Sequence, residues 1–112
     1  MPSFYFLVTS QKQIDKNMET KIIINNNKGE VQAFEGDVQV GQINFNKEEG
    51  VLSIEHTEVI EAFARKGIAG ILVQAATDYA VHHNLKIKPI CSYARKWFKQ
   101  HRQYKKIVVD LK

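Results

Sequence analysis

Hydrophobic and polar residues alternate along the first half of the chain, and this alternation predicts β-strands that each bury one face. Four strands are predicted, at Lys21–Asn25, Glu30–Glu35, Val38–Phe45 and Val51–Val59. Gly36-Asp37, between the second and the third strand, is typical of a hairpin turn, and Asn46–Gly50 is predicted to form the next turn. The first half of the chain is therefore predicted to fold as an antiparallel sheet.

From Ile68 onward the hydrophobic residues recur every three or four positions, which is typical of an amphipathic helix. The residues on this face are Ile68, Ile71, Leu72, Ala75, Ala76, Tyr79 and His83. Asn84 tolerates the left-handed backbone conformation that ends many helices. The helix is therefore predicted to begin after Gly67 and to stop before Asn84.

The last part of the chain alternates strand and helix signals. Lys86–Cys91 is predicted to be a strand, and Pro89 within it cannot donate a ladder hydrogen bond, so this strand lies at an edge or loses a neighbour there. Ser92 is a candidate cap for a second helix, and Tyr104–Leu111 is predicted to form a last strand. Antiparallel strands followed by helix, strand and helix predict an α+β domain.

The chain length and composition fit one folded unit. A chain of 112 residues suits a single domain, here predicted over residues 21–112 after an N-terminal extension, residues 1–20, of uncertain structure. No apolar run approaches the roughly 18–20 residues of a membrane helix. Phe4–Val8 is too short for the core of a signal peptide, so we expect a cytoplasmic protein without a membrane partner. A single cysteine, Cys91, argues against an internal disulfide and a cysteine-rich zinc site.

Charge is distributed unevenly along the chain. Residues 1–64 contain ten acidic and five basic residues, whereas residues 65–112 contain eleven basic and two acidic ones. A basic half of this kind attracts anions such as nucleic acid, a membrane surface or a phosphorylated small molecule. The simpler alternative is a solvated basic face.

The start of the predicted helix combines features that are unfavourable unless an anion binds there. Arg65 and Lys66 lie at the positive end of the helix dipole. No Ser, Thr, Asp or Asn precedes Gly67 to cap the free amides, while Gly67 and Gly70 let another atom approach the backbone. We therefore predict a phosphate or pyrophosphate site at residues 65–70. The alternative is a surface helix with an uncapped N-terminus.

Neither common nucleotide motif is present at this site. The Gly-Lys-Ser/Thr ending of a triphosphate-binding loop is missing, and Gly67-Ile68-Ala69-Gly70 is only part of the dinucleotide motif GxGxxG.

The strand VLSIEHTEV followed by IEAFARKGIAGILVQAATDYA resembles the acetyl-CoA site of the GNAT acetyltransferases. The motif of that family, Arg/Gln-x-x-Gly-x-Gly/Ala, falls on Ala64-Arg65-Lys66-Gly67-Ile68-Ala69, with Ala64 in place of the usual Arg or Gln. The chain is also similar to a small stand-alone GNAT-like subfamily, whose shared residues fall here on His56-Thr57-Glu58-Val59, Gly67-Ile68-Ala69-Gly70 and Cys91. This similarity covers about residues 21–105.

The resemblance implies a GNAT-like fold, with a mixed, mostly antiparallel sheet flanked by two or more helices. It implies that acetyl-CoA is the co-substrate, and that the backbone near Val59 pairs with the pantetheine arm. The residues whose amides would hold the pyrophosphate are Arg65, Lys66, Gly67, Ile68, Ala69 and Gly70. The strand that carries Pro89 would diverge from the strand that ends at Val59, opening the slot for the thioester.

The candidates for the chemistry of acetyl transfer are His56, Glu58, Tyr93 and Cys91. With strict alternation Leu52, Ile54, His56 and Glu58 share one face of their strand. The family often places a carboxylate base on this strand, so Glu58 with His56 is preferred over Glu55. Tyr93 is the candidate that protonates the leaving thiolate, with Tyr104 as a weaker substitute. The alternative for His56 is an ordinary half-buried strand residue.

Cys91 is the candidate for a covalent route. It precedes the predicted cap Ser92, and a helix N-terminus stabilises a thiolate, which could accept the acetyl group before the amine does. The alternative is that Cys91 is a small buried residue that takes no part in catalysis.

Three functions stay open at this level. The first is an N-acetyltransferase that acts on an unidentified amine; the second is a non-catalytic module that binds or senses acyl-CoA. The third, a nucleic-acid binder that uses Lys86–Lys106, is disfavoured because no known binding motif is present. We expect no metal, because no carboxylates or cysteines stand at ligand spacing. The protein is expected to be a monomer or a weak homodimer in which Phe4–Val8 joins a partner's sheet.

Overall fold

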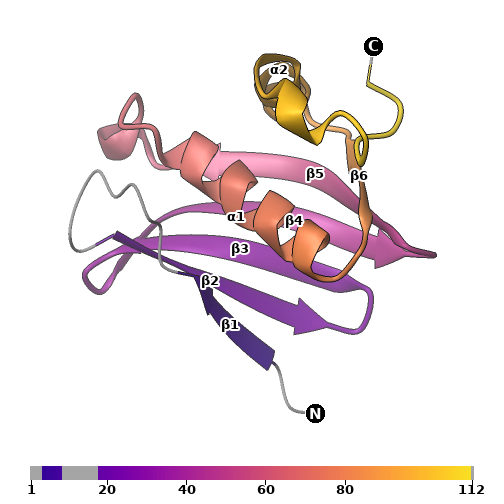
Figure 1. Ribbon diagram of the computed structural model, residues 1–112. Helices are drawn as coiled ribbons and strands as arrows, with labels where there is room; N and C mark the ends of the chain where they lie inside the picture. Colours follow the sequence, from indigo (N-terminus) through magenta and orange to yellow (C-terminus); the bar gives the residue numbers. More distant parts are fainter. Residues whose placement is uncertain (1–3, 9–17, 112) are drawn as a thin grey trace.

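The computed structural model describes residues 4–8 and 18–111, and most of the N-terminal extension expected over residues 1–20 lies outside this range. Its centre is one six-stranded sheet in the order β1-β2-β3-β4-β5-β6 (Figure 1). The strands are β1 (Phe4–Val8), β2 (Met18–Asn25), β3 (Lys28–Glu35), β4 (Val38–Glu48), β5 (Val51–Val59) and β6 (Lys86–Pro89). The other elements are the helices α1 (Ile68–His82) and α2 (Ser92–Gln100) and the 3-10 turns η1 (Glu61–Phe63) and η2 (Arg102–Tyr104). The predicted α+β class is confirmed.

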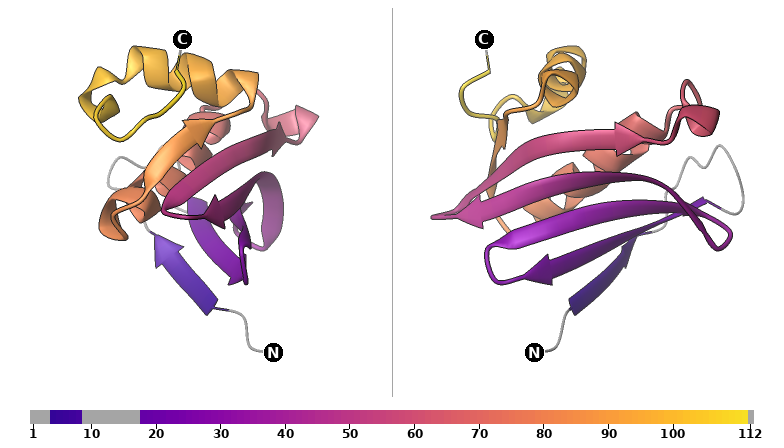
Figure 2. Two further views of the ribbon diagram at one scale, coloured as in Figure 1. Left: turned by 90° about the vertical axis from the view of Figure 1, so that its right-hand side faces the viewer. Right: turned by 180° about the vertical axis from the view of Figure 1, so that it is seen from behind.

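Neighbouring strands are antiparallel except for β5 and β6, which are parallel. Parallel neighbours need a crossover connection, and α1 supplies it. Helix α1 lies across one face of the sheet, and α2 lies beside the β6 edge; the opposite face carries no helix in the part of the chain that the structure describes (Figure 2). The core therefore lies between the sheet and α1.

The packing of α1 on the sheet depends on a glycine in β4. A Cβ atom at Gly41 would lie 3.0 Å from the Glu58 carbonyl oxygen and 3.2 Å from the side chains of Ile68 and Leu72. A larger residue would push the first turns of α1 away from the strand. The buried core of the molecule includes Ile22, Val31, Ile43, Phe45, Leu52, Ile54, Ile68, Leu72, Val73 and Ala76.

A β-bulge in β5 corrects one prediction. Asn44 pairs with His56, but the next residue, Phe45, pairs with Ile54, so Glu55 is an extra residue in β5. A bulge reverses which residues face inward from that point on. Ile54 is fully buried whereas His56 is exposed. The prediction that Leu52 and Ile54 share a face with His56 and Glu58 is therefore wrong.

Local signals predicted the ends of α1 and the start of β6 correctly, but β6 is two residues shorter than the predicted Lys86–Cys91. Helix α1 begins at Ile68 after Gly67, and Asn84 has the predicted left-handed conformation, with φ 58°. β6 ends at Pro89, which cannot donate to a ladder. β4 is longer than predicted, because it continues to Glu48.

The last predicted strand, Tyr104–Leu111, is wrong. Its only pairing in the described chain is a single bridge between Ile87 and Val108, with two 2.8 Å hydrogen bonds that link Ile87 to Ile107 and Val109. Turns occupy residues 102–107, and Asp110 has φ 59°, so the segment is not extended long enough for a ladder. It covers the β6 edge instead.

Phe4–Val8 pairs with β2 of its own chain, with Phe4 opposite Ile24 and Val8 opposite Thr20. Among the residues described, no helix is long and apolar enough to cross a membrane.

Candidate functional site

The N-terminus of α1 presents free backbone amides. Gly67 is its N-cap, with φ 79°, and provides no side-chain cap. The first amide with a helical partner is that of Ile71, which donates to the Gly67 carbonyl over 3.1 Å. In the described chain, the amides of Ile68, Ala69 and Gly70 have no hydrogen-bond acceptor. Such a terminus is suited to bind an anion.

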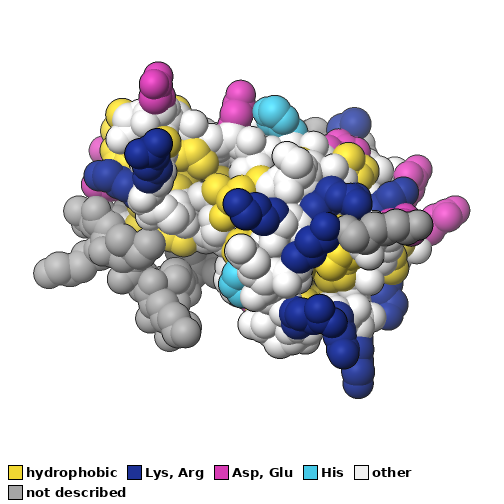
Figure 3. Space-filling model, turned by 90° about the horizontal axis from the view of Figure 1, so that it is seen from above, with side chains coloured by type: hydrophobic (Ala, Val, Ile, Leu, Met, Phe, Trp, Pro, Cys, Tyr) yellow, Lys and Arg dark blue, Asp and Glu magenta, His cyan; other side chains and the backbone are white. Residues whose placement is uncertain are grey.

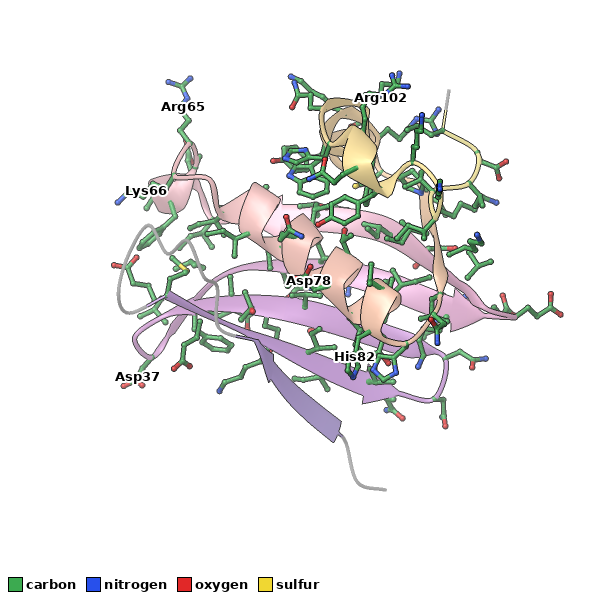
Figure 4. All side chains as sticks on the ribbon, in the orientation of Figure 1. Asp37, Arg65, Lys66, Asp78, His82 and Arg102 are labelled. Carbon is green, nitrogen blue, oxygen red and sulfur yellow. The ribbon has the colours of Figure 1, made fainter. Side chains whose placement is uncertain are left out.

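The loop before α1 adds positive charge to these amides. Arg65 has a left-handed backbone with φ 70°, and both Arg65 and Lys66 are exposed. Their side chains point outward from the loop (Figure 4). Neither forms an ion pair with a carboxylate within the described residues. Lys and Arg side chains also gather on the upper surface around α2 (Figure 3), so this part of the surface attracts anions as well.

Among the described strands, none pairs with one edge of β5 near this loop. β4 pairs with β5 from Val51 to Val59, but β6 pairs only with Val51–Ile54. The Ile54 carbonyl then accepts from the amides of Ile90 over 2.9 Å and Cys91 over 3.1 Å, after which the chain turns into α2. The predicted divergence of the two strands is confirmed, and the edge of β5 over residues 55–59 is left open.

Cys91 stands where β5 and β6 diverge. It is the N-cap of α2, and its Sγ accepts a hydrogen bond from the Ala94 amide over 3.4 Å. The predicted cap, Ser92, is instead the first helical residue. Cys91 Sγ also lies 3.2 Å from Thr57 Oγ1. The half-buried thiol is thus held at a helix N-terminus beside the open edge.

Tyr93 connects α2 with the start of α1. A Cβ atom at Gly70 would lie 3.4 Å from the Tyr93 hydroxyl oxygen and 3.4 Å from Trp97 Nε1. Burial raises the pKa of Tyr93 above its usual value, because the ionised phenolate is less well solvated there. Tyr93 therefore stays protonated at neutral pH and can donate a proton or a hydrogen bond near the free amides.

His56 and Glu58 lie on the other face of β5. In the register with β4, Thr57 pairs with the buried Ile43, so the bulge turns Thr57 toward the helices and its neighbours away from them. His56 Nε2 lies 3.7 Å from Glu58 Oε2, and both side chains are mostly exposed. The structure brings Cys91 and Tyr93 to the helix side, whereas His56, Glu58 and the bulged Glu55 are separated from them by the strand.

A hollow of about 420 Å³ opens at the end of β5 that carries Glu58. Its lining residues are Gln39, Gly41, Gln42, Glu58, Val59 and Ile60. The sequence pattern did not single out Gln39, Gln42 or Thr57 as site residues, because their positions depend on the pairing of β4 with β5. Within the described residues, no three His, Cys, Asp or Glu side chains cluster as metal ligands would.

Residues 30–107 match the family model described as GCN5-related N-acetyl-transferase. The chain is also 41% identical to Protein NATD1 of Xenopus tropicalis over 49 residues, and 38% identical to Protein NATD1 of Homo sapiens over 50 residues. These matches cover 44% and 45% of this chain, and 45% and 44% of the relatives. The chain thus spans less than half the length of these curated relatives.

Solved structures share the fold. The NMR solution structure of a GCN5-like protein from Staphylococcus aureus matches with a TM-score of 0.61 and 24% identity, over 88% of this chain and 94% of that one. A crystal structure of a GNAT-family protein from Desulfovibrio desulfuricans matches with a TM-score of 0.54 and 18% identity, over 71% of this chain and 54% of that one. With most of the chain matched by the family model and with this fold, the protein belongs to the GCN5-related N-acetyltransferase (GNAT) family.

Proposed function

We propose that the protein is an acetyl-CoA-dependent N-acetyltransferase that transfers an acetyl group to an amine. The observation that carries this proposal is the position of the uncapped N-terminus of α1 next to the open edge of β5, in a chain of the GNAT family. A free helix terminus and a free strand edge are the two backbone features that a diphosphate joined to an amide-containing arm would use.

The pyrophosphate of acetyl-CoA would bind at residues 65–70. Three amides without an acceptor and two cations without a carboxylate partner, among the described residues, offer hydrogen bonds and charge of the required sign. Ala64 removes one side-chain contact that the family motif usually supplies, but amide contacts do not depend on that side chain. The basic half of the chain adds attraction for the 3′-phosphate.

The pantetheine arm would lie along β5 near Val59, as an added strand. β6 leaves this edge at Ile54, so its backbone groups can pair with the amides of the arm. When bound, acetyl-CoA supplies the activated acetyl group. A thioester at this edge can be approached from both faces of β5.

Proton transfer would then be divided between the two faces. The Glu58 carboxylate, with His56 beside it, accepts the proton of the attacking amine on the open face. Tyr93 on the helix side carries its phenol proton at neutral pH and donates it to the leaving thiolate.

Cys91 supports a two-step route through the same edge. Its thiolate would attack the acetyl carbonyl, the carbon–sulfur bond to coenzyme A would break, and the released thiolate would take the proton from Tyr93. The amine would then attack the acetyl-cysteine, restoring Cys91. The Ala94 amide donates a hydrogen bond to Sγ, the atom that attacks in the first step and leaves in the second.

A second function, non-catalytic binding of acyl-CoA, is favoured by Ala64 at the motif position and by the exposure of the His56–Glu58 pair. Turnover separates the two functions. Incubation with acetyl-CoA and a panel of amines should release free thiol only for an enzyme. An NMR titration in which coenzyme A leaves all amide peaks of residues 59–70 unmoved would exclude both.

A further inference from the structure

We propose that the acceptor is a lysine-containing peptide that lies extended across the open face of the sheet, with its amine at Glu58. This inference rests on the proposed function and names its substrate class. The helix-free face is defined here as the open face (Figure 2, right). Its central residues are Glu30, Gln32, Gln39, Gln42, Asn44, Glu55, His56 and Glu58.

Amide side chains form a hydrogen-bonded row along β4 on this face. Gln39 Nε2 donates to Gln42 Oε1 over 3.0 Å, and Gln42 Nε2 donates to Asn44 Oδ1 over 3.3 Å. Polar residues are expected on a strand face that no helix covers, and on β4 they are amides that bond to one another. Amides carry both donors and acceptors, which suits them to recognise a peptide backbone.

The row lies beside the candidate base. In the register, Gln42 is directly opposite Glu58 and Asn44 is directly opposite His56. Directly paired strand residues have Cβ atoms about 4.5–5.5 Å apart. A chain held by the row would therefore pass next to the carboxylate that accepts the amine proton.

The charge at the β5 end of the open face favours a cation. Glu55 and Glu58 form no ion pair with Lys or Arg in the part of the chain described. The lysines of this face, Lys21 and Lys28, lie on β2 and β3, away from β5. The negative sign at the β5 end is opposite to that of the α1 loop on the other side of β5, where Arg65 and Lys66 stand. An acceptor with positive charge thus prefers the open face, and coenzyme A prefers the other.

Two hollows on this face favour an elongated acceptor over a compact amine. The first, of about 420 Å³, holds Glu58, Gln39 and Gln42. The second, of about 610 Å³, includes Lys28, Glu30, Gln32, Asn44 and Glu55. Gln39 and Asn44 are five residues apart, roughly 15 Å along a strand. A peptide of about five residues spans both, whereas a small amine would fill only the first.

The test is an NMR titration of the whole chain with three probes: a blocked pentapeptide Ala-Lys-Ala-Lys-Ala, the same peptide with norleucine for both lysines, and spermidine. We expect the lysine peptide to move the side-chain amide peaks of Gln39, Gln42 and Asn44, and the norleucine peptide to leave them in place. Glu58→Gln should weaken binding roughly tenfold, because a charged hydrogen bond is lost. Gln42→Met should weaken it less.

Asp78→Asn is the matched control, since it removes an exposed acid of α1, which packs on the opposite face of the sheet from the row. Equal shifts with both peptides, no shift with either, or shifts with spermidine alone would overturn the peptide assignment. A coenzyme A titration of the same sample keeps the two proposals apart. If coenzyme A moves the amide peaks of residues 67–70 but the peptides move none, only the acceptor assignment is overturned. If the lysine peptide moves peaks but coenzyme A does not, the acceptor role is overturned together with the proposed function.

Discussion

The two faces of β5 differ in how they are built. On the helix side, the contacts are mostly backbone: the free amides of α1, the open strand edge and the amide that reaches Cys91. On the open face they are side chains, chiefly Glu58 and the amide row. A site made of backbone suits a ligand common to a whole family, whereas a site made of side chains suits an acceptor that differs between members. This difference predicts that substitutions can weaken coenzyme A binding and acceptor binding separately.

Glu58→Gln is expected to have the largest effect. Removal of a general base typically lowers kcat about 10²–10⁴-fold. The side chain is 67% exposed, so the folded state should be affected little. Steady-state rates, together with the coenzyme A dissociation constant, check this. Rates within twofold of the wild type would mean that Glu58 is not the base and that the two faces do not share the chemistry.

The glycines of the α1 loop sharpen the helix side of the comparison. Gly67→Val forces a β-branched residue to φ 79°, which costs about 1–3 kcal/mol and displaces the free amides. We expect a lower Tm and roughly tenfold weaker binding of coenzyme A. Peptide binding on the open face should not change.

Gly70→Ala is the control for that change. A Cβ atom there meets Tyr93 and Trp97 at 3.4 Å, which is an ordinary contact, and Ala is favoured over Gly in a helix by up to about 1 kcal/mol. The Tm should hold or rise. A fall as large as that of Gly67→Val would mean that space, rather than backbone conformation, limits this loop.

Cys91 can be examined through two variants. Cys91→Ala loses both the cap of α2 and the Thr57 contact, whereas Cys91→Ser keeps a capping hydroxyl, so the Ala variant should be less stable by about 1 kcal/mol. Intact-mass analysis after incubation with acetyl-CoA should show an acetyl adduct on the wild type and none on Ala. Turnover by both variants at the wild-type rate would restrict Cys91 to a structural role.

The sequence predicted local features of the fold correctly and features that depend on distant residues poorly. The uncapped helix start at Gly67 and the left-handed Asn84 are local, because neighbouring residues alone decide them. The bulge at Glu55 is not local: it depends on how β5 pairs with β4, which a single strand's alternation does not encode. This bulge is why His56 was predicted on the wrong face and why Thr57 was missed.

The same limit applies at the end of the chain. Tyr104–Leu111 has the composition of a strand, but the Tyr104 hydroxyl accepts a hydrogen bond from Gln74 of α1 over 2.8 Å, which ties the segment to the helix. A contact between residues thirty positions apart leaves no periodic signal in the sequence.

Replacement of Tyr93 is expected to have the smallest effect, and this effect is specific to alkaline pH. Because burial raises the pKa of Tyr93 in the folded state, the unfolded chain releases this proton first, at about pH 10, and the folded protein loses stability as the pH rises further. Tyr93→Phe removes that part of the alkaline loss, so the free energy of unfolding of the wild type should fall relative to that of the variant above about pH 10, and their difference should stay constant below it. Urea unfolding from pH 7 to 11 measures it. If Tyr93 is also the proton donor, the variant should turn over more slowly while binding the lysine peptide unchanged; slower turnover with weaker peptide binding would instead place Tyr93 on the acceptor side and break the division between the faces.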